Sequence, residues 1–164
     1  MAITAFAAWL FLPFALPIGI WVAWNDMKFM KIPNKAVVAL TVVFLVVGLI
    51  AIPLAEYPWR LLQLVGVLGV GFFLNMVGGV GAGDAKFAAA MAPFIAPQDL
   101  RIVIILFAAV LLASVATHRG FRHLSWFRAR TPDWVSWEKK DFPMGLALGS
   151  TLIFYLATGA VWGS

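Results

Sequence analysis

The chain has no cysteine among its 164 residues. Disulfides, thiolate metal sites and cysteine nucleophiles are therefore excluded. Histidine is nearly absent as well: His118 and His123 lack the spacing of zinc ligands and have no third ligand beside them. The sequence therefore predicts no metal site.

Charge is also scarce. Charged residues make up 12% of the chain and hydrophobic residues 63%, and the mean hydropathy is +0.97. A soluble domain of this length cannot bury so many apolar side chains, which indicates an integral membrane protein surrounded by lipid. The net charge of +5 does not indicate a nucleic-acid partner, because the basic residues are confined to short segments between apolar runs.

The apolar runs predict an all-α, polytopic membrane helix bundle of about six helices, since about 20 helical residues cross a bilayer. The fourth run is short and interrupted by Pro93 and Pro97, so it spans only by tilting, by thinning the bilayer, or through a kinked connection. The first run has no basic segment or small-residue cleavage site, which favours a retained helix over a signal peptide. The expected helices cover residues 3–24, 36–54, 61–77, 85–96, 100–117 and 143–162.

The positions of the basic residues predict the orientation. With the N-terminus outside, ten of the twelve lysines and arginines lie on the inner side and only Arg60 and Arg101 lie outside. The largest inner loop, residues 118–141, carries three tryptophans among its basic residues. We expect it to lie on the anionic inner surface of the membrane as a topology anchor without chemistry.

Two of the seven acids lie outside the solvated turns and loops where acids are expected in a membrane protein. The other five fall in short outer turns or in the inner loop, where solvated or paired carboxylates are expected. Asp26 ends the first helix, and Asp84 lies in "GAGDAK" between the third and fourth helices. Two crossings separate them, so both lie at the inner boundary, where an unpaired carboxylate is costly and suggests a function.

Two acids that converge in a bundle have the chemistry of an aspartic peptidase. One ionised carboxylate takes a proton from water, while the protonated one polarises the scissile carbonyl. Crowding raises one pKa, but the titration belongs to the pair, so the base and the acid stay unassigned. Gly81 and Gly83 are expected to let the backbone bend and let a substrate strand or partner helix approach Asp84. From the residues alone, a structural or ion-coupling role is an equal alternative.

Other interpretations of these segments are weaker. The glycine run lacks the ending of a phosphate loop, has Asp84 where phosphate would bind, and follows no strand that a dinucleotide site would need. Two Gly-x-x-x-Gly pairs, at 79–83 and 145–149, are explained by helix packing, which does not account for the acid. Ser114 and His118 share a helix face, so a serine hydrolase is formally possible, but no oxyanion motif accompanies them.

Four more polar or turn residues near these acids have expected roles. Lys86 either steadies the charge of the acid pair or meets the substrate, or it is an interfacial lysine that reaches toward water. Pro33 and Asn34 are expected to end a turn and start the second helix, with Asn34 as its N-cap. An interhelical hydrogen bond is favoured over catalysis for Asn75.

At these residues the chain resembles the type IV prepilin peptidases, and among them the short enzymes that serve Flp-type pili. Three patterns carry the resemblance in order: "DMKFMKIPN" at 26–34, "GAGDAK" at 81–86 and "FPMGLALG" at 142–149. The last has Pro-Met-Gly where Pro-Tyr-Gly is commoner. The resemblance covers nearly the whole chain and implies one integral membrane peptidase domain, residues 1–164. It implies an aspartic endopeptidase with Asp26 and Asp84 as the catalytic pair, and Lys86, Gly81, Gly83, Pro33 and Asn34 as substrate-binding or supporting residues.

The same resemblance implies a substrate and a location. The enzyme would remove the short polar leader of a prepilin or pseudopilin, usually just after a glycine, at the cytoplasmic face of the bacterial inner membrane, for pilus assembly or type II-like secretion. Long members of the family carry an N-terminal region with cysteine pairs and methyltransferase activity. This chain begins directly with a membrane helix, so no cofactor is expected, S-adenosylmethionine included. The alternative is a non-enzymatic or ion-coupled small membrane component of a pilus or secretion machine.

Overall fold

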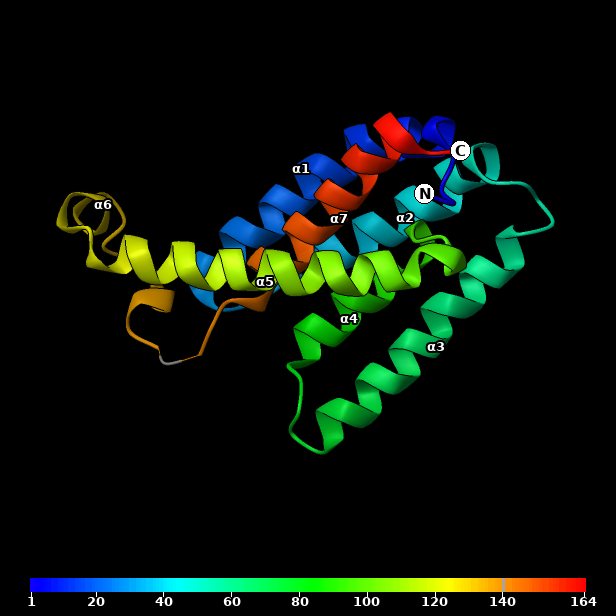
Figure 1. The fold of residues 1–164 in the computed structure, drawn as a ribbon. Helices are drawn as coiled ribbons and strands as arrows, with labels where there is room; N and C mark the ends of the chain where they lie inside the picture. The colour runs from blue at the N-terminus through cyan, green and yellow to red at the C-terminus, as the bar shows by residue number, and fades with distance from the viewer. Residues whose placement is uncertain (140) are drawn as a thin grey trace.

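The computed structural model describes residues 1–139 and 141–164, which form helices joined by short connections (Figure 1). No strand occurs in these two stretches, so the predicted all-α class is confirmed. The α-helices are α1 (Ala5–Phe29), α2 (Asn34–Ala51), α3 (Tyr57–Met76), α4 (Ala82–Met91), α5 (Leu100–His123), α6 (Ser125–Arg130) and α7 (Met144–Trp162), and the 3-10 turns are η1 (Ala92–Phe94), η2 (Pro97–Asp99) and η3 (Val135–Trp137).

Five helical segments in the described residues are long and apolar enough to cross a membrane, which makes the chain a multi-pass membrane protein. They are α1, α2, α3, α7 and the stretch Pro97–His123, which contains α5. Two of them run further than expected: α1 continues past Trp24 to Phe29, and α5 continues past Thr117 to His123. Hydropathy marks where a helix leaves the apolar layer, whereas backbone hydrogen bonding continues beyond that point.

Five segments of the described chain have the length of a membrane-spanning helix, and the fourth expected helix is short and interrupted at Pro93, as the sequence predicted, so that passage is made by α4 followed by η1. α4 has 10 residues, about 15 Å of helix, and the chain then changes to the 3-10 turn η1 that contains Pro93. A bilayer core is about 30 Å thick. The chain still returns to the opposite end of the bundle, because Ile95 and Ala96 contact Arg60 and Tyr155 there.

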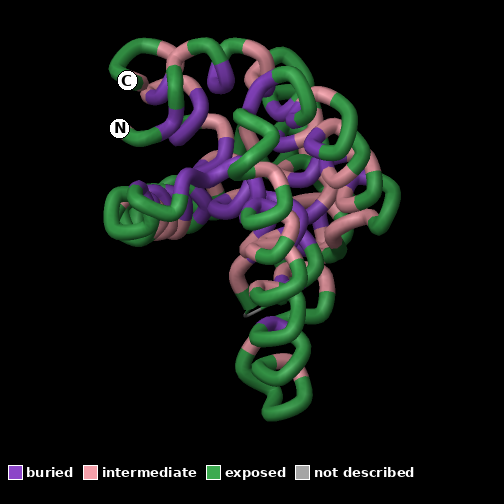
Figure 2. Tube along the Cα trace, turned by 90° about the vertical axis from the view of Figure 1, so that its right-hand side faces the viewer, coloured by how far each residue is buried: buried purple, intermediate pink, exposed green. Residues whose placement is uncertain are grey.

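The centre of the bundle is the antiparallel pair α1 and α7, which pack most extensively on each other. Their backbones approach closely: a Cβ atom on Gly149 would lie 2.6 Å from the carbonyl oxygen of Gly19, so helix packing explains this glycine as predicted. The rings of Phe11, Phe44 and Phe94 pack together between α1, α2 and η1. Figure 2 shows the buried residues gathered in this middle region.

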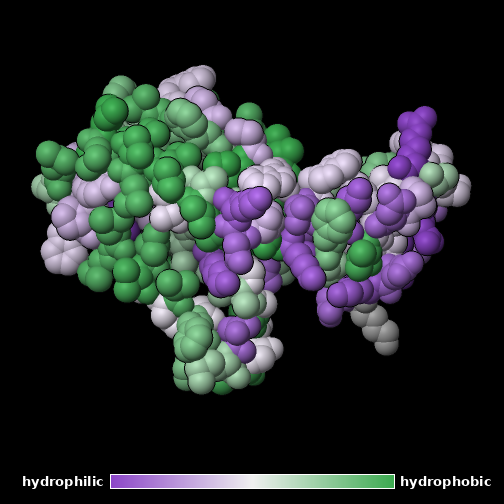
Figure 3. Space-filling view, turned by 180° about the vertical axis from the view of Figure 1, so that it is seen from behind, coloured by the Kyte–Doolittle hydropathy of each residue, from purple (hydrophilic) through white to green (hydrophobic). Residues whose placement is uncertain are grey.

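The surface is divided between an apolar body and a polar end. Hydrophobic side chains cover most of the body, and hydrophilic ones gather at the end that carries α6 (Figure 3). Leu112 on α5 is 72% exposed, as expected of a side chain that faces lipid. We call the end formed by residues 26–35, 78–86 and 118–141 the polar end, and the opposite end, which holds both termini, the terminal end.

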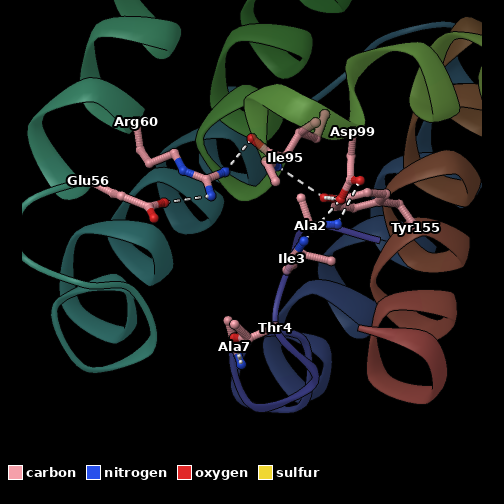
Figure 4. A network of polar contacts seen from close by, with 10 residues as sticks. Ala2, Ile3, Thr4, Ala7, Glu56, Arg60, Ile95, Asp99 and Tyr155 are labelled. Carbon is pink, nitrogen blue, oxygen red and sulfur yellow. Dashed lines mark hydrogen bonds and ion pairs between the residues drawn. The ribbon is translucent and has the colours of Figure 1, made fainter. Parts of the chain in front are cut away.

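A buried polar network closes the terminal end (Figure 4). Asp99 accepts hydrogen bonds from the backbone N–H groups of Ala2 (2.8 Å) and Ile3 (3.0 Å) and from the hydroxyl of Tyr155 (2.9 Å). That hydroxyl in turn accepts a hydrogen bond from the backbone N–H of Ala96 at 3.0 Å. The network joins the N-terminal segment to η2 and α7.

Two charged residues of the terminal end, Asp99 and Arg60, are buried, and for Asp99 this corrects the expectation of a solvated carboxylate in an outer turn. Asp99 is 2% exposed and satisfied by the network just described. Arg60 is equally enclosed; its guanidinium donates to the carbonyl of Ile95 and pairs with Glu56 at 3.3 Å. Arg60 thereby ties the start of α3 to the residues that follow η1.

The inner loop folds onto the bundle instead of lying wholly on the membrane surface. Trp134 and Trp137 are buried and stack on each other, and Trp134 packs edge-on against Trp24 of α1. Trp126 on α6 is exposed, so it alone of the three loop tryptophans suits the expected contact with lipid. The packing of this loop positions residues 141–144, which enter the polar cleft described next.

Candidate active site

A cleft of about 640 Å³ opens at the polar end between the ends of α1, α4 and α7. Both singled-out acids, Asp26 and Asp84, line it. Lys31, Lys86, Asn34, the glycine loop 78–83 and residues 141, 142 and 144 complete most of the lining. The structure thus brings together, in one cavity, residues from all three sequence patterns.

Asp26 comes from the last turns of α1 and is buried, with 5% of its surface exposed. Its carboxylate accepts a hydrogen bond from the backbone N–H of Gly145 at 2.7 Å. Glycine is required there, since a Cβ atom at position 145 would lie 2.8 Å from the Cβ of Asp26. The start of α7 therefore fixes the position of this carboxylate.

Asp84 comes from the first turn of α4 and is only half-buried. It lies outside the five membrane-length segments. Two effects raise the pKa of the Asp84 carboxyl to about 6: burial, which is the larger, and the negative charge of Asp26. A carboxyl with this pKa is partly protonated near neutral pH, as an acid that shares a proton requires.

The glycine loop bends as expected, but the bend lies at Gly78 and not at Gly81 or Gly83. The left-handed backbone that favours glycine occurs at Gly78 (φ 75°), whereas Gly81 has ordinary extended backbone and Gly83 is helical. The expected close approach is present: a Cβ atom on Gly81 would lie 2.6 Å from the Asp84 carboxylate, and one on Gly83 would lie 3.3 Å from Ile32. Small residues therefore let Asp84 and the 30–34 turn pack closely.

Lys86 reaches across the cleft to Asn34, whose side-chain oxygen accepts its hydrogen bond at 3.4 Å. The expected N-cap role of Asn34 is wrong, because Pro33 holds the N-cap position and Asn34 is the first helical residue. Pro33 starts α2 as expected, with its carbonyl bonded to Ala36, but it does not line the cleft. Lys86 and Asn34 are therefore the two supporting residues with side chains at the site.

Comparison with known proteins gives one match. The model of the type IV leader peptidase family matches residues 13–117, well over half of the chain. The chain belongs to the type IV leader peptidase family. No curated protein and no solved structure match it. The matched region includes Asp26, Asp84 and Lys86 but ends before the 142–149 pattern.

The contacts of Ser114 and His118 do not support the alternative of a serine hydrolase site. Ser114 and His118 are both buried, and no hydrogen bond joins them. The imidazole of His118 stacks on Trp137 instead, and its Nε2 has no partner among the described residues. Asn75 donates to the carbonyl of Val80 in the loop after its own helix, so the expected interhelical bond is wrong.

Sequence reasoning missed three features of the polar cleft. Gly145 was noted only for helix packing, yet it is the hydrogen-bond donor to Asp26. Asp141 was placed in the solvated loop but lines the cleft as a third carboxylate. Met30, in left-handed backbone with φ 53°, ends α1 and lines the cleft. The 142–149 pattern signalled the first, and no sequence signal identified the last two.

No three histidine, aspartate or glutamate side chains within residues 1–139 and 141–164 gather closely enough to hold a metal ion. The polar cleft presents a buried carboxylate at Asp26, a half-buried one at Asp84 and an exposed one at Asp141, together with two lysines. Carboxylates in two protonation states can move protons to and from a substrate in such a cavity.

Proposed function

We propose that this member of the type IV leader peptidase family is an aspartic-type endopeptidase in which Asp26 and Asp84 form the catalytic pair. The observation that carries the proposal is their convergence: acids from α1 and α4, far apart in the sequence, line the same cleft at the polar end. The raised pKa of Asp84 supports the requirement that one member of the pair is protonated.

In the proposed reaction the ionised carboxylate takes a proton from a water molecule in the cleft, and the water oxygen attacks the scissile carbonyl carbon. The protonated carboxyl donates a hydrogen bond to the carbonyl oxygen, where negative charge develops. Collapse of the tetrahedral intermediate breaks the C–N bond, and a proton from the pair leaves with the amine. The proton is shared by the pair, so the proposal assigns the base and acid roles to Asp26 and Asp84 jointly and not to either residue alone.

The proposed substrate is a prepilin or pseudopilin, whose polar leader enters the cleft while its apolar helix stays in the membrane. The polar end is proposed to face the cytoplasm of a bacterium, as its lysines and arginines favour. Lys86 is proposed to contact the substrate or to steady the charge of the pair, together with Asn34. Leader removal by one domain spanning residues 1–164 would then support pilus assembly or type II-like secretion.

Purified protein reconstituted in lipid vesicles with a Flp-type prepilin tests this function directly. Intact-mass analysis should show loss of the leader mass and appearance of the mature pilin. The alternative, an ion-coupled or non-enzymatic component of the same machine, predicts an uncleaved prepilin in every condition. Absence of cleavage by folded wild-type protein would therefore overturn the proposed function.

A further inference from the structure

A second, apolar cavity lies beside the polar cleft, within the membrane-facing body. It has a volume of about 500 Å³ and lies between α3, α4 with η1, α5 and α7. We call it the lateral groove. Figure 1 shows α3 slanting away from α5 toward the C-terminal end of α3, so the two helices diverge on either side of the groove. Its lining includes Gln63, Gly66, Met91, Val103, Phe107 and Leu148.

The lateral groove begins where the polar cleft ends, because α4 forms a wall of both. Asp84 lines the cleft, while Ala88, Met91 and Ala92 line the groove. Residues spaced by four, seven and eight positions share one face of a helix. One continuous stripe on α4 therefore leads from the candidate catalytic carboxylate into the apolar groove.

One polar residue that lines the groove, Gln63, carries a side-chain atom without a partner among the described residues. The side-chain oxygen of Gln63 is buried, and no hydrogen-bond donor in the described part of the chain reaches it. An unsatisfied buried amide oxygen is unfavourable, so a ligand that brings a hydrogen-bond donor within reach of the Gln63 side chain is favoured. A lipid acyl chain has no donor, whereas a polypeptide helix with one polar side chain has.

We propose that the lateral groove binds the apolar helix of the substrate, downstream of the scissile bond. This inference rests on the proposed peptidase function and identifies which part of the substrate is held in the membrane. The leader lies in the polar cleft, the scissile bond lies at Asp84, and the helix follows the α4 stripe toward the terminal end.

The position of Gln63 gives the binding a register. Met91 and Ala92 lie two helical turns beyond Asp84, about 11–12 Å along the axis at 1.5 Å per residue. They line the groove together with Gln63. A substrate helix that runs alongside therefore presents a polar side chain to Gln63 about seven or eight residues after the scissile bond.

Two glycines of α3 provide a matched pair of variants. A Cβ atom added at Gly66 or at Gly69 meets nothing within 4 Å, so a side chain at either position starts in open space. Gly66 lines the groove and Gly69 does not. Gly66→Phe should fill the groove and raise the KM for a full-length Flp-type prepilin about tenfold or more, while Gly69→Phe should keep it within about twofold of wild type.

Photo-crosslinking supplies a second measurement that does not depend on the fold of the Gly66→Phe protein. A photoreactive amino acid at position 66 in the Asp84→Asn protein should form adducts with the apolar helix of the prepilin, and one at position 69 should not. Adducts with lipid alone, or equal KM values for the two phenylalanine variants, would overturn the groove assignment. Wild-type protein that cleaves no prepilin would instead reject the proposed function, so the two failures are distinguishable.

Discussion

At the scale of single residues, the candidate site depends on a glycine as much as on its acids. Gly145 donates to Asp26 and leaves no room for a side chain. Gly145→Ala should therefore displace the Asp26 carboxylate and lower kcat for leader removal about tenfold or more, with a smaller effect on KM, because small misplacements of a catalytic group are costly. The measurement is steady-state cleavage of a prepilin.

Gly120→Ala is the matched control for that substitution. Gly120 lies on α5 at the polar end, and an added Cβ meets nothing within 4 Å. Its kcat should equal that of wild type. A Gly145→Ala protein that cleaves as fast as the Gly120→Ala protein would show that the Gly145 contact does not position Asp26 for catalysis.

The pH dependence of cleavage also belongs to the residue scale. Burial, and then the charge of Asp26, raises the pKa of Asp84 to about 6. Above that pH the pair loses its shared proton, so the cleavage rate should fall as pH rises from about 6 toward 8; at lower pH the second carboxylate becomes protonated and the rate falls again. Initial rates in buffers of constant ionic strength measure this profile. A rate that rises steadily from pH 6 to pH 8 would contradict it.

Most of the residue-level site was accessible from the sequence, because the two acids were improbable in an apolar chain. The chemistry of burying a carboxylate singled out Asp26 and Asp84 without any structure. The roles of Gly145 and Asp141 were not accessible in the same way. They depend on how the start of α7 and the residue that lines the cleft before it pack against α1, which no sequence period predicts.

At the scale of elements, the terminal end is held by side chains rather than by helix packing alone. The Tyr155 hydroxyl connects Asp99 to the backbone N–H of Ala96. Tyr155→Phe should lower the free energy of unfolding by about 1–3 kcal/mol, because it leaves that buried N–H without an acceptor. Thermal unfolding in detergent measures the effect.

The other tyrosine of the chain is the control for this prediction. Tyr57 donates to the carbonyl of Leu45 in an exposed position, outside the buried network. Tyr57→Phe should therefore change the unfolding temperature less than Tyr155→Phe. Equal shifts in the two proteins would mean that the buried network does not stabilise the terminal end.

The elements themselves were predictable wherever apolar runs were long. Hydropathy located α2, α3 and α7 to within a few residues. It underestimated α1 and α5, whose last turns are polar, and it overestimated α4, since the run past Met91 is apolar but contains Pro93. Hydropathy indicates which residues lie in an apolar environment. It does not indicate where helical hydrogen bonding ends, which depends on prolines and on polar residues in the last turn.

At the scale of the whole molecule, the proposed orientation rests on the division of basic residues between the two ends. Because the chain has no cysteine, single cysteines can be introduced and labelled without background. Cysteines at Lys28 and Arg128 should resist a membrane-impermeant thiol reagent applied from outside, whereas one at Glu56 should react. Labelling of position 28 from outside would reverse the orientation and remove the cleft from a cytoplasmic leader.

The central claim, that Asp26 and Asp84 act as one catalytic unit, is tested most directly by comparing single and double variants in the reconstituted cleavage reaction. Residues that work as a unit are not additive: removing either one costs about as much as removing both. Asp133→Asn, a change to an exposed acid away from the cleft, controls for loss of a charge. We predict that Asp26→Asn, Asp84→Asn and the double variant all fold and lose leader removal to the same extent. The Asp133→Asn protein should cleave at the wild-type rate. Near wild-type cleavage by either single variant would contradict the account.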